Sequence, residues 1–564
     1  MKNYLVSETR SGFKTLTYRD QEEGRDIRLH SAYDPVKEAQ RSVSGFSRGR
    51  SSVLLVSGLA LGYHLEHLAL SGDIDILVIE RDPEVVEICS QVNPGILKKI
   101  MIITSASEIE SYFDRLDMSG FKGISHYTHR PSYQIDPEFY DSITGNISRH
   151  VSSRVSDLLT RFEFEERWIR NIFRNLKHLA YAEGVGRFFG KFKGYPGIIV
   201  SAGPSLKKNI SELENLRNRA VIVAVDTAYK VLSRHNITPH FVVTLDAQKY
   251  SSKHFLGAPA NDTVLVADIV SCPSILNSYS GRKVMSTTSK YFTDEQGHTR
   301  RETTPVMDWV EKFTGHFGDI QSGGSVATSV FDMLLNFGCD PIILIGQDLA
   351  YTGREIHCTG TYHNDDWLPG INRLKNLECI NQGVIRKRKI KYVPGYGGDN
   401  PVITDFVFDL YKSWFEDSSR RVSVDVINAT EGGAAIENTR ELSLSRSVPG
   451  EKTGKSPDMI ISEIFRGSGR LDISPLKAAL SSTMAEIDKL IKAFEDNVNN
   501  PVEEAVTMVE SENLSPLFRP LLRKINIYLV RRNIEGSKGE NMLLEEIKGA
   551  AFKLKAYISE SGLC

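Results

Sequence analysis

Gly197-Ile-Ile-Val-Ser-Ala-Gly-Pro-Ser-Leu206 is the stretch of sequence that decides the fold. Its first four residues predict a buried strand, and a turn of small residues follows, in which Pro204 presets the first turn of a helix. A strand, a glycine turn and a helix in this order are typical of a parallel α/β sheet, and the amides at such a helix start attract anions. The turn lacks the Gly-Lys-Ser/Thr ending of a Walker loop.

Several apolar, β-branched runs around this turn predict the rest of a parallel sheet that is buried on both faces. They cover residues 220–225, 241–245, 263–267 and 341–345, with later candidates at 390–393 and 422–426. Asp226 and Asp246 directly follow two of these runs, and Asp348 follows a third. Because parallel strands end at one edge, we expect these acids beside Gly203, where they would bind ribose, base or a magnesium ion that carries phosphates.

An earlier α/β pattern predicts strands at residues 52–57, 74–79 and 100–103. Gly58-Leu-Ala-Leu-Gly62 follows the first strand and Glu80 ends the second, as in folds that bind a nucleotide or S-adenosylmethionine. The third glycine of that pattern is missing, so a fold without a ligand is the alternative.

The predicted fold class is α/β, with two Rossmann-like parallel-sheet domains followed by an α-helical C-terminal domain. We expect an N-terminal domain with an antiparallel β preamble at residues 1–135, a helical connector at 136–193, a central catalytic domain at 194–440, a linker at 441–470 and helices at 471–564.

Composition excludes several classes of protein. The net charge of −2 over 564 residues offers no general attraction for nucleic acid, and no run approaches the roughly 18 apolar residues of a membrane span. The start is polar and lacks the core of a signal peptide, and the six cysteines form no Cys-x-x-Cys pair. We therefore expect a cytoplasmic protein without a zinc ribbon or disulfides. The composition indicates no oligomeric state.

Three further segments contribute candidate site residues. Ser322, Gly323, Gly324 and Ser325 open an apolar helix and predict a second anion site. Gly346-Gln-Asp-Leu-Ala-Tyr351 precedes a loop with His357, Tyr362 and His363, which we expect to fold over the site. Asn428-Ala-Thr-Glu-Gly-Gly-Ala434 adds the acid Glu431 and a pair of glycines that permit close approach.

These motifs resemble the bacterial motility-associated factor (Maf) flagellin glycosyltransferases over about residues 40–440. The resemblance rests on Val200-Ser-Ala-Gly-Pro-Ser-Leu206, Asp226-Thr-Ala-Tyr229, Pro239-His-Phe-Val-Val-Thr-Leu-Asp246, Ser322-Gly-Gly-Ser-Val326, Gly346-Gln-Asp-Leu-Ala-Tyr351 and Asn428-Ala-Thr-Glu-Gly-Gly433. Gly58-Leu-Ala-Leu-Gly-Tyr-His64 and Glu80-Arg-Asp-Pro83 also resemble the first domain of that family. It implies transfer of a nonulosonic acid, such as pseudaminic or legionaminic acid, from a cytidine monophosphate (CMP) donor to serine or threonine of flagellin. That activity would support flagellum assembly and motility.

The central domain of that family is similar to bacterial sialyltransferases, and the likeness implies roles for single residues. Those implied around the nucleotide are Gly203, Pro204, Ser205, Leu206, Asp226, Asp246, Ser322 and Gly323. The motifs themselves add Thr227, Gly324, Ser325 and Glu431 as nucleotide-binding candidates. Tyr351 would steady the leaving phosphate. Sialyltransferases place a general-base histidine before a Thr-Asp pair, whereas Gly395-Tyr-Gly-Gly-Asp-Asn-Pro-Val-Ile-Thr-Asp405 has none. Either Asp399, a strand-end acid such as Asp348 or a loop histidine such as His357 would then be the base, or the base comes from elsewhere in the protein.

Two other functions remain open. The central motifs also resemble archaeal hydroxymethylpterin pyrophosphokinases, in which strand-end aspartates would hold Mg²⁺ and ATP. A flagellin-binding scaffold without catalysis is the third. For the transferase, we expect the CMP-activated sugar as donor, flagellin as partner, no dedicated metal site, and Mg²⁺ only as a companion of the phosphates.

Overall fold

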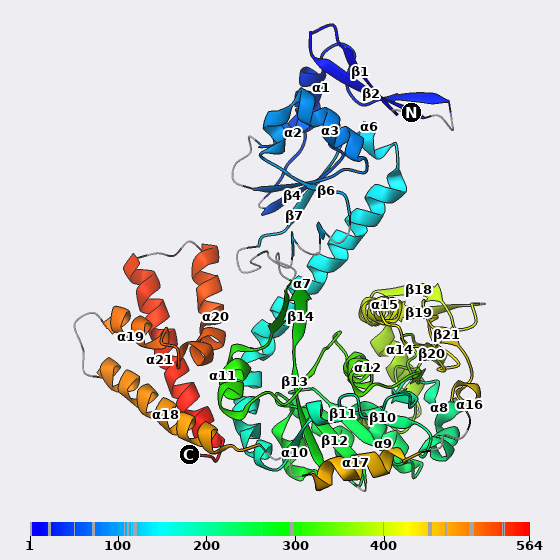
Figure 1. Ribbon diagram of the computed structural model, residues 1–564, viewed down its shortest axis with the longest axis vertical. Coiled ribbons are helices and arrows are strands. Elements are labelled where there is room, and N and C mark those ends of the chain that lie inside the picture. The colour runs from blue at the N-terminus through cyan, green and yellow to red at the C-terminus, as the bar shows by residue number, and fades with distance from the viewer. Residues whose placement is uncertain are drawn as a thin grey trace. The chain divides into compact units, whose positions relative to one another are not determined.

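The computed structural model describes residues 3–564 apart from 21–23, 50, 70–73, 106–107, 110–111, 114–115, 117–120, 261, 294–297, 399, 449, 451–453, 468–470, 496–500, 533 and 535. The chain forms two compact units (Figure 1). Unit 1 comprises Met1–Glu163 and Lys524–Gly536, and unit 2 comprises Phe164–Arg523 and Ser537–Cys564. Parallel sheets and C-terminal helices confirm the predicted fold class, whereas the five-segment division stays a prediction.

Unit 1 begins with a three-stranded antiparallel sheet, which confirms the expected preamble. Its strands are β1 (Tyr4–Glu8), β2 (Lys14–Asp20) and β3 (Arg25–Arg28). The helix α1 (Pro35–Ser44) follows and begins where the Asp34 carboxylate accepts the Lys37 N–H.

The main sheet of unit 1 has four parallel strands in the order β6-β5-β4-β7. The strands are β4 (Val53–Ser57), β5 (Asp75–Ile79), β6 (Met101–Ile103) and β7 (Ile124–Thr128). The helices α2 (Tyr63–Ala69), α3 (Pro83–Val92), α4 (Pro94–Leu97) and α6 (Arg130–Tyr133) connect or follow them. The strand β7 was not predicted, because Ile124-Ser-His-Tyr-Thr contains three polar residues and lacks a continuous apolar run.

The predicted connector is the long helix α7 (Pro137–Asn175), which runs from unit 1 into unit 2. In unit 2 the side-chain amides of Asn171 and Asn175 donate to backbone carbonyls of residues 247 and 269–271, at distances of 2.8–3.0 Å. These bonds fix the end of the helix against strand ends of the large sheet.

Unit 2 is built on a ten-stranded sheet in which every pairing is parallel. Along the sheet lie β16 (Asp319–Ile320), β13 (Lys283–Thr288), β12 (Val264–Asp268), β11 (Phe241–Thr244), β10 (Val221–Val225), β9 (Gly197–Val200), β17 (Ile342–Ile345), β20 (Val426–Asn428) and β21 (Arg440–Glu441), and β8 (Glu183–Gly184) pairs with β13. The apolar residues of β9, β10 and β17 are almost completely buried and form the core.

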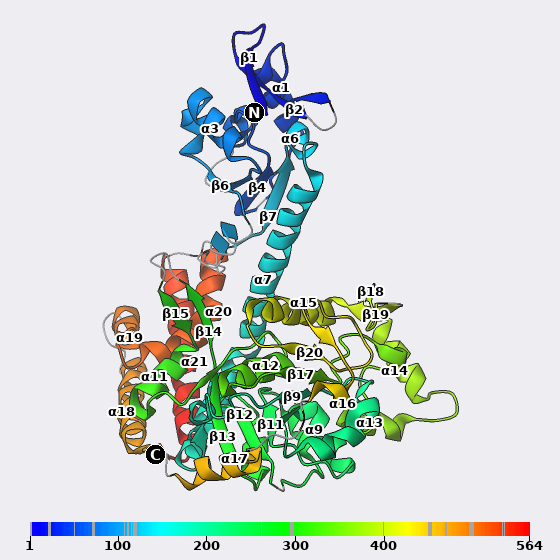
Figure 2. The ribbon, with the colours of Figure 1, turned by 45° about the vertical axis from the view of Figure 1, so that its right-hand side comes forward.

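Helices and short turns connect these strands (Figure 2). They are η1 (Leu176–Ala180), η2 (Val185–Phe188), α8 (Leu206–Asn209), η3 (Ile210–Leu216), α9 (Asp226–Arg234), η4 (Lys249–Phe255), α10 (Pro273–Ser278), α11 (Pro305–Thr314), α12 (Val326–Phe337), η5 (Thr352–Arg354), α13 (Tyr362–Trp367), η6 (Leu368–Gly370), α14 (Leu377–Ile385), α15 (Phe406–Arg421), α16 (Leu444–Ser447) and α17 (Pro457–Arg466).

Two antiparallel hairpins lie outside the parallel sheet, β14 (Lys290–Thr293) with β15 (Thr299–Glu302), and β18 (Ile390–Pro394) with β19 (Pro401–Asp405). The strand expected at 390–393 is therefore real but belongs to a largely exposed hairpin. The strand expected at 422–426 begins only at Val426.

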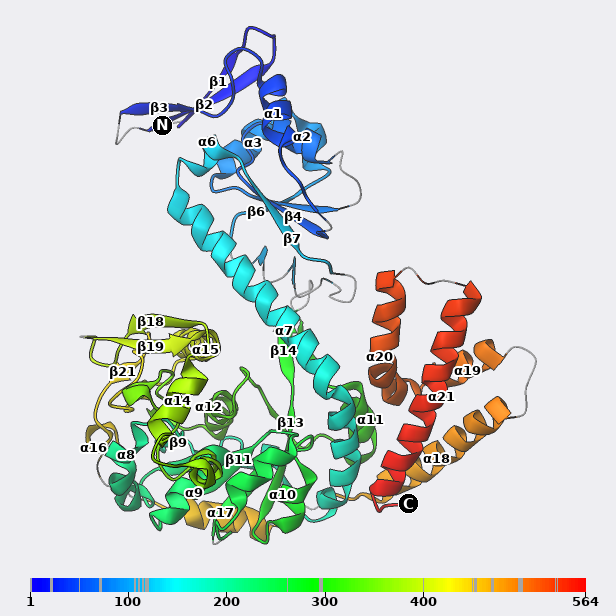
Figure 3. The same cartoon turned by 180° about the vertical axis from the view of Figure 1, so that it is seen from behind.

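The predicted C-terminal helices are confirmed as α18 (Ser474–Glu495), α19 (Pro501–Val509), α20 (Ser515–Arg532) and α21 (Gly536–Glu560). Within unit 2, α18 and α21 converge toward the C-terminal end of α21 (Figure 3), where Lys555 pairs with Asp488 at 2.5 Å. Arg170 of α7 pairs with Glu560 at 2.6 Å, and Arg523 pairs with Glu165 at 2.9 Å. Among the described residues, no helix has the length and apolar character needed to cross a bilayer.

Candidate functional site

The glycine turn follows β9, the strand at which the order of strands in the large sheet reverses. From β9 the chain adds β10, β11, β12, β13 and β16 on one side and then returns to place β17 on the other side. Open α/β sheets bind ligands in the crevice at the carboxyl ends of such a pair of strands. The sheet therefore places Ser201 to Ser205 at the position that favours a ligand.

Asp348 closes this turn from the neighbouring strand end. Its carboxylate accepts the Ser205 N–H at 3.2 Å and the Ser205 hydroxyl at 2.5 Å, and the side chain is 3% exposed. A Cβ on Gly203 would lie 2.0 Å from Asp348 Oδ2, so glycine is required for this approach. Burial raises the pKa of Asp348, and the Ser205 hydroxyl opposes that rise. The amide expected to bind phosphate is thus already bound to a carboxylate, in a helix only four residues long.

Other residues predicted for the site pack or form hydrogen bonds around the contact between Ser205 and Asp348. Leu206 and Pro204 are buried beside the turn, with Leu206 at 0% exposure. Glu431 accepts the Asn209 amide at 2.7 Å, and its carbonyl accepts Lys208 Nζ. A Cβ on Gly433 would lie 2.2 Å from the Asp348 carbonyl oxygen, so this glycine also serves close packing.

Two predicted acids, Asp226 and Asp246, lie just after the ends of β10 and β11. Asp226 accepts the Thr227 N–H at 2.7 Å and the Thr244 hydroxyl at 3.0 Å, whereas Asp246 accepts the Gln248 N–H at 2.8 Å and the Ser251 hydroxyl at 2.7 Å. Burial raises the pKa of Asp226 to about 6, partly opposed by the hydroxyl of Thr244.

Three histidines, His254, His357 and His363, form a cluster of neighbouring rings. The ring centroids of His357 and His363 are 4.6 Å apart, and those of His254 and His363 are 5.3 Å apart. The Cys358 N–H donates to the Ala202 carbonyl at 2.9 Å, which ties the loop of His357 to the glycine turn.

The cluster is neutral at neutral pH. Burial lowers the pKa of His254 to about 4, of His357 to about 3 and of His363 to about 4. Asp246 opposes the fall for His254, and Asp226 opposes it for His363. Tyr250 Oη lies 3.2 Å from His363 Nδ1. A neutral imidazole near carboxylates can accept a proton from a hydroxyl.

Tyr351 is committed to a different partner. Its hydroxyl donates to Asp405 Oδ2 at 2.6 Å, and the residue is 5% exposed. The Asp405 carboxylate also accepts the Val407 and Phe408 N–H groups at the start of α15. Contact between Tyr351 and a leaving phosphate would require this bond to change. Asp399, the other candidate base, lies outside the described residues.

The second glycine turn, at 322–325, is packed by aromatic rings and capped by its own helix. A Cβ on Gly323 would lie 2.4 Å from the Trp414 ring, and one on Gly324 would lie 3.1 Å from Tyr411. Thr328 Oγ1 accepts the Gly323 N–H at 2.9 Å, and Ser322 Oγ accepts the Gly324 N–H at 3.2 Å. Ser325 forms a capping box with Thr328. These amides therefore already have partners.

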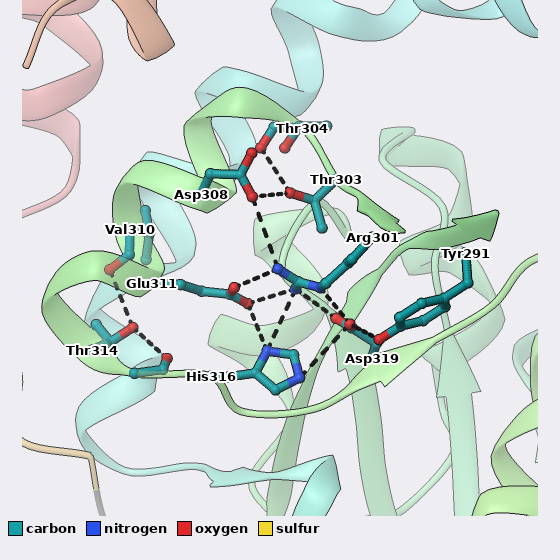
Figure 4. Close-up of polar contacts among 11 residues, drawn as sticks. Tyr291, Arg301, Thr303, Thr304, Asp308, Val310, Glu311, Thr314, His316 and Asp319 are labelled. Atoms are coloured by element: carbon teal, nitrogen blue, oxygen red, sulfur yellow. Dashed lines mark hydrogen bonds and ion pairs between the residues drawn. The ribbon is translucent and has the colours of Figure 1, made fainter. Parts of the chain in front are cut away.

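Glu311, His316 and Asp319 form a candidate metal cluster near the sheet edge (Figure 4). Arg301 lies among them and pairs with Asp319 at 2.5 Å and with Glu311 at 2.8 Å. The guanidinium already neutralises both carboxylates and joins β15 to α11 and β16. The donor set therefore does not fit a resident metal ion.

Two residues near the site, Asp268 and His254, were not predicted from the sequence. Asp268 ends β12, accepts the Thr288 hydroxyl at 2.6 Å and has a pKa raised to about 6 by burial. Its strand-end position repeats the pattern of Asp226, so that signal was present. His254 lies in the short helix η4, whose sequence has no periodicity that would select it.

The comparisons with known proteins agree with this architecture. Residues 170–354 match the family described as "MptE-like: 6-hydroxymethylpterin diphosphokinase MptE-like". Two uncharacterized proteins of Treponema pallidum (strain Nichols) are 24% identical, over 196 residues (32% of this chain, 50% of the relative) and over 273 residues (47% and 46%). The chain spans about half the length of the curated relatives it matches.

Among solved structures, the chain is similar to the Maf glycosyltransferase from Magnetospirillum magneticum AMB-1, with a TM-score of 0.52 and 14% identity. The likeness covers 100% of this chain and 92% of that protein. The chain is therefore Maf-like in fold and contains an MptE-like domain at residues 170–354.

Proposed function

We propose that the protein is a glycosyltransferase that moves a nonulosonic sugar from a CMP-activated donor to serine or threonine of flagellin. The observation that carries the proposal is the cluster of His254, His357 and His363, on which Asp246 and Asp226 act electrostatically through His254 and His363. The Maf-like fold supports the same class of reaction. All six cysteines are free, in keeping with a reaction in the cytoplasm.

In the proposed step, the acceptor oxygen bonds to the anomeric carbon while the bond from that carbon to the phosphate oxygen breaks. CMP leaves with the electron pair, and an imidazole of the cluster takes the proton of the acceptor hydroxyl. His363 is the preferred base, because it contacts Tyr250 and both other histidines. The strand-end acids orient donor and acceptor, which lowers the entropic part of the barrier.

The test uses purified protein, flagellin and CMP-activated pseudaminic or legionaminic acid, with the intact mass of flagellin as readout. A donor-dependent mass gain is expected, and no gain with any matched donor and acceptor would contradict the proposal. His363→Asn should lower the rate by about 100-fold or more, as expected for loss of a general base. The matched control is His178→Asn, because His178 contacts Asn277 away from the cluster.

The second candidate is a Mg²⁺-ATP-dependent diphosphokinase, and the observation in its favour is the MptE-like match at residues 170–354. Asp226, Asp246 and Asp268 would then hold magnesium phosphates. Turnover of ATP that requires both Mg²⁺ and 6-hydroxymethylpterin would select it. If the protein binds flagellin but neither transfers the sugar nor turns over ATP, it is a flagellin-binding scaffold.

A further inference from the structure

One exposed surface of unit 2 combines positive charge with apolar side chains. The run Arg386-Lys-Arg-Lys-Ile-Lys-Tyr392 leads from the end of α14 into β18 and contains five basic residues and no acid. All seven of its residues are exposed, and so are Phe406 and Val407 at the start of α15. We call residues 386–392, 406 and 407 the basic hairpin surface. The net charge of −2 for the whole chain therefore hides a local excess of positive charge.

The alternation of β18 turns its apolar side chains outward. Lys391 pairs with Asp409 of α15, and Val393 is buried in the core, so these two residues point inward. Successive side chains of a strand point to opposite faces. Ile390 and Tyr392 therefore point away from the core, and they are 48% and 67% exposed.

The hairpin is held in place by the rest of unit 2. Ile390 pairs with Asp405 across the hairpin, so Phe406, the next residue, lies at the same end as Ile390. The Tyr351 N–H donates to the Ile403 carbonyl at 2.8 Å, which joins β19 to the loop after β17. Figure 1 shows β18, β19 and α15 next to one another at the margin of unit 2. The apolar and basic side chains are thus presented by elements that the core supports.

Most of the positive charge on this surface is not neutralised. Arg388 lies 3.9 Å from a carboxylate oxygen of Asp405, and Lys391 pairs with Asp409, yet both cationic side chains are about half exposed. The other three cations form no ion pair with a carboxylate in the part of the chain that the structure describes, and they are Arg386, Lys387 and Lys389. Charges of one sign that lie this close together attract an anionic partner.

An anionic membrane surface matches both the charge and the apolar side chains. Clusters of roughly 4–8 Lys and Arg bind acidic headgroups, and neighbouring apolar side chains enter the boundary of the acyl chains. Nucleic acid would pair with the cations and stack on aromatic rings, but it would leave Ile390 and Val407 in water. Lysine is depleted at interfaces between proteins, whereas three of the five cations here are lysines. Lipid is therefore the partner that this surface fits best.

We propose that the basic hairpin surface docks unit 2 reversibly onto a membrane that contains anionic lipids. Ile390, Tyr392 and Phe406 enter the headgroup region, where aromatic and aliphatic side chains replace contacts with water by contacts with lipid. The lysine side chains extend along this apolar layer and place their ammonium groups at the lipid phosphates. The proposal concerns binding alone and does not rest on the transfer reaction proposed above.

The test is co-sedimentation of the full chain with vesicles of two compositions. Vesicles of equimolar phosphatidylcholine and phosphatidylglycerol should bind the protein, and a higher salt concentration should release it. Vesicles of phosphatidylcholine alone should bind about 100-fold more weakly, because the three unpaired cations contribute about 5-fold each. Equal binding to both kinds of vesicle, or binding to neither, would overturn the proposal.

A pair of charge variants locates the contact. Lys387→Gln combined with Lys389→Gln should weaken binding to the anionic vesicles about 25-fold, or about 5-fold for each charge. The matched control combines Lys191→Gln with Lys193→Gln, which changes the net charge equally but in an exposed loop between η2 and β9. This control should bind as the wild type does. Unchanged binding of the first variant, or an equal loss in both, would refute the location.

An apolar variant separates a membrane from other anionic partners. Tyr392→Ser should weaken vesicle binding about 10-fold, because a side chain that enters the interface is lost. Tyr181→Ser, at another exposed tyrosine of unit 2, should have no effect. Circular dichroism checks that each variant folds, and all of the substituted residues are exposed. If single-stranded DNA or poly-glutamate binds as tightly as the vesicles do, and the lysine variant loses that binding, the partner is nucleic acid or an acidic protein and the proposal is wrong.

Discussion

The buried histidines of unit 1 predict that acid destabilises this unit. Burial lowers the pKa of His30 to about 3 and of His64 to about 4, and it lowers the pKa of His129 well below its usual range. In the unfolded chain each imidazole has a pKa of about 6.5. As the pH falls below about 6.5, the unfolded state binds protons that the folded state does not, so stability is lost.

The magnitude follows from the displacement of each pKa. A pH of 5 is about 1.5 units below the pKa of an unfolded imidazole and is above the pKa of both folded imidazoles. Each imidazole therefore lowers the free energy of unfolding by about 2 kcal/mol. His30 and His64 together therefore lower the free energy of unfolding by about 4 kcal/mol between pH 7 and pH 5, and His129 acts in the same direction.

Hydrogen exchange of β4 and β5 peptides, corrected for the intrinsic effect of pH, measures this free energy for unit 1. His64→Gln keeps a donor for the Gly58 carbonyl but cannot titrate, so its pH 7 to pH 5 loss should be about 2 kcal/mol smaller than in the wild type. Trp168, Trp309, Trp367 and Trp414 are the four tryptophans, and all lie in unit 2. Their fluorescence therefore provides an internal control that should change with pH equally in both proteins.

Two results would refute the reasoning. The first is an opening free energy of β4 that is the same at pH 7 and pH 5. The second is an identical acid loss in the wild type and His64→Gln, which would mean that His64 is protonated in the folded unit.

Three further substitutions test unit 2. Gly203→Ala should lower the free energy of unfolding by about 1–3 kcal/mol, since its Cβ would lie 2.0 Å from Asp348. Denaturant unfolding followed by tryptophan fluorescence measures this loss. The control Gly370→Ala should cost far less, because a Cβ there meets open space. Tyr351→Phe should cost about 1–3 kcal/mol in the same assay, because Asp405 loses a buried donor, and an unchanged midpoint would contradict this. Arg301→Met should cost roughly 2–4 kcal/mol by leaving the carboxylates of Glu311 and Asp319 without their cation. Zn²⁺ should not raise the melting temperature of the wild type, and a clear rise would show that the cluster in Figure 4 does bind metal.

The features that could be predicted from the sequence are those that depend on residues close together in the chain. Asp226 and Asp246 follow apolar runs, so their place at the carboxyl edge could be inferred from the strands alone. Asp268 directly follows the run 263–267 in the same way, so the same signal was present but was not used. The strands β7 and β13 were missed because more than half of their residues are polar, and the burial of Ser286 and Thr287 in β13 comes from packing within the fold.

The contacts that decide the site are long-range, and no local pattern contains them. Asp348 follows β17, the strand next to β9, and its carboxylate binds Ser205. From the local sequence alone, the turn was expected to be an open phosphate site. The Gly323 turn likewise has a local glycine signal, yet the ring that requires glycine comes from Trp414. His254 joins His357 and His363 only because η4 and the loop before α13 meet.

The central position of β9 also has a consequence for synthesis of the chain. Gly197 pairs with Val221 on one side and with Ile342 on the other, and the second partner is made roughly 140 residues later. At about 5–20 residues per second, β9 waits about 7–30 s on the ribosome with one edge unpaired. An open, apolar strand edge is a template for association with other chains. We therefore expect slowed translation between residues 225 and 340 to increase aggregation of the nascent protein more than slowed translation after residue 440.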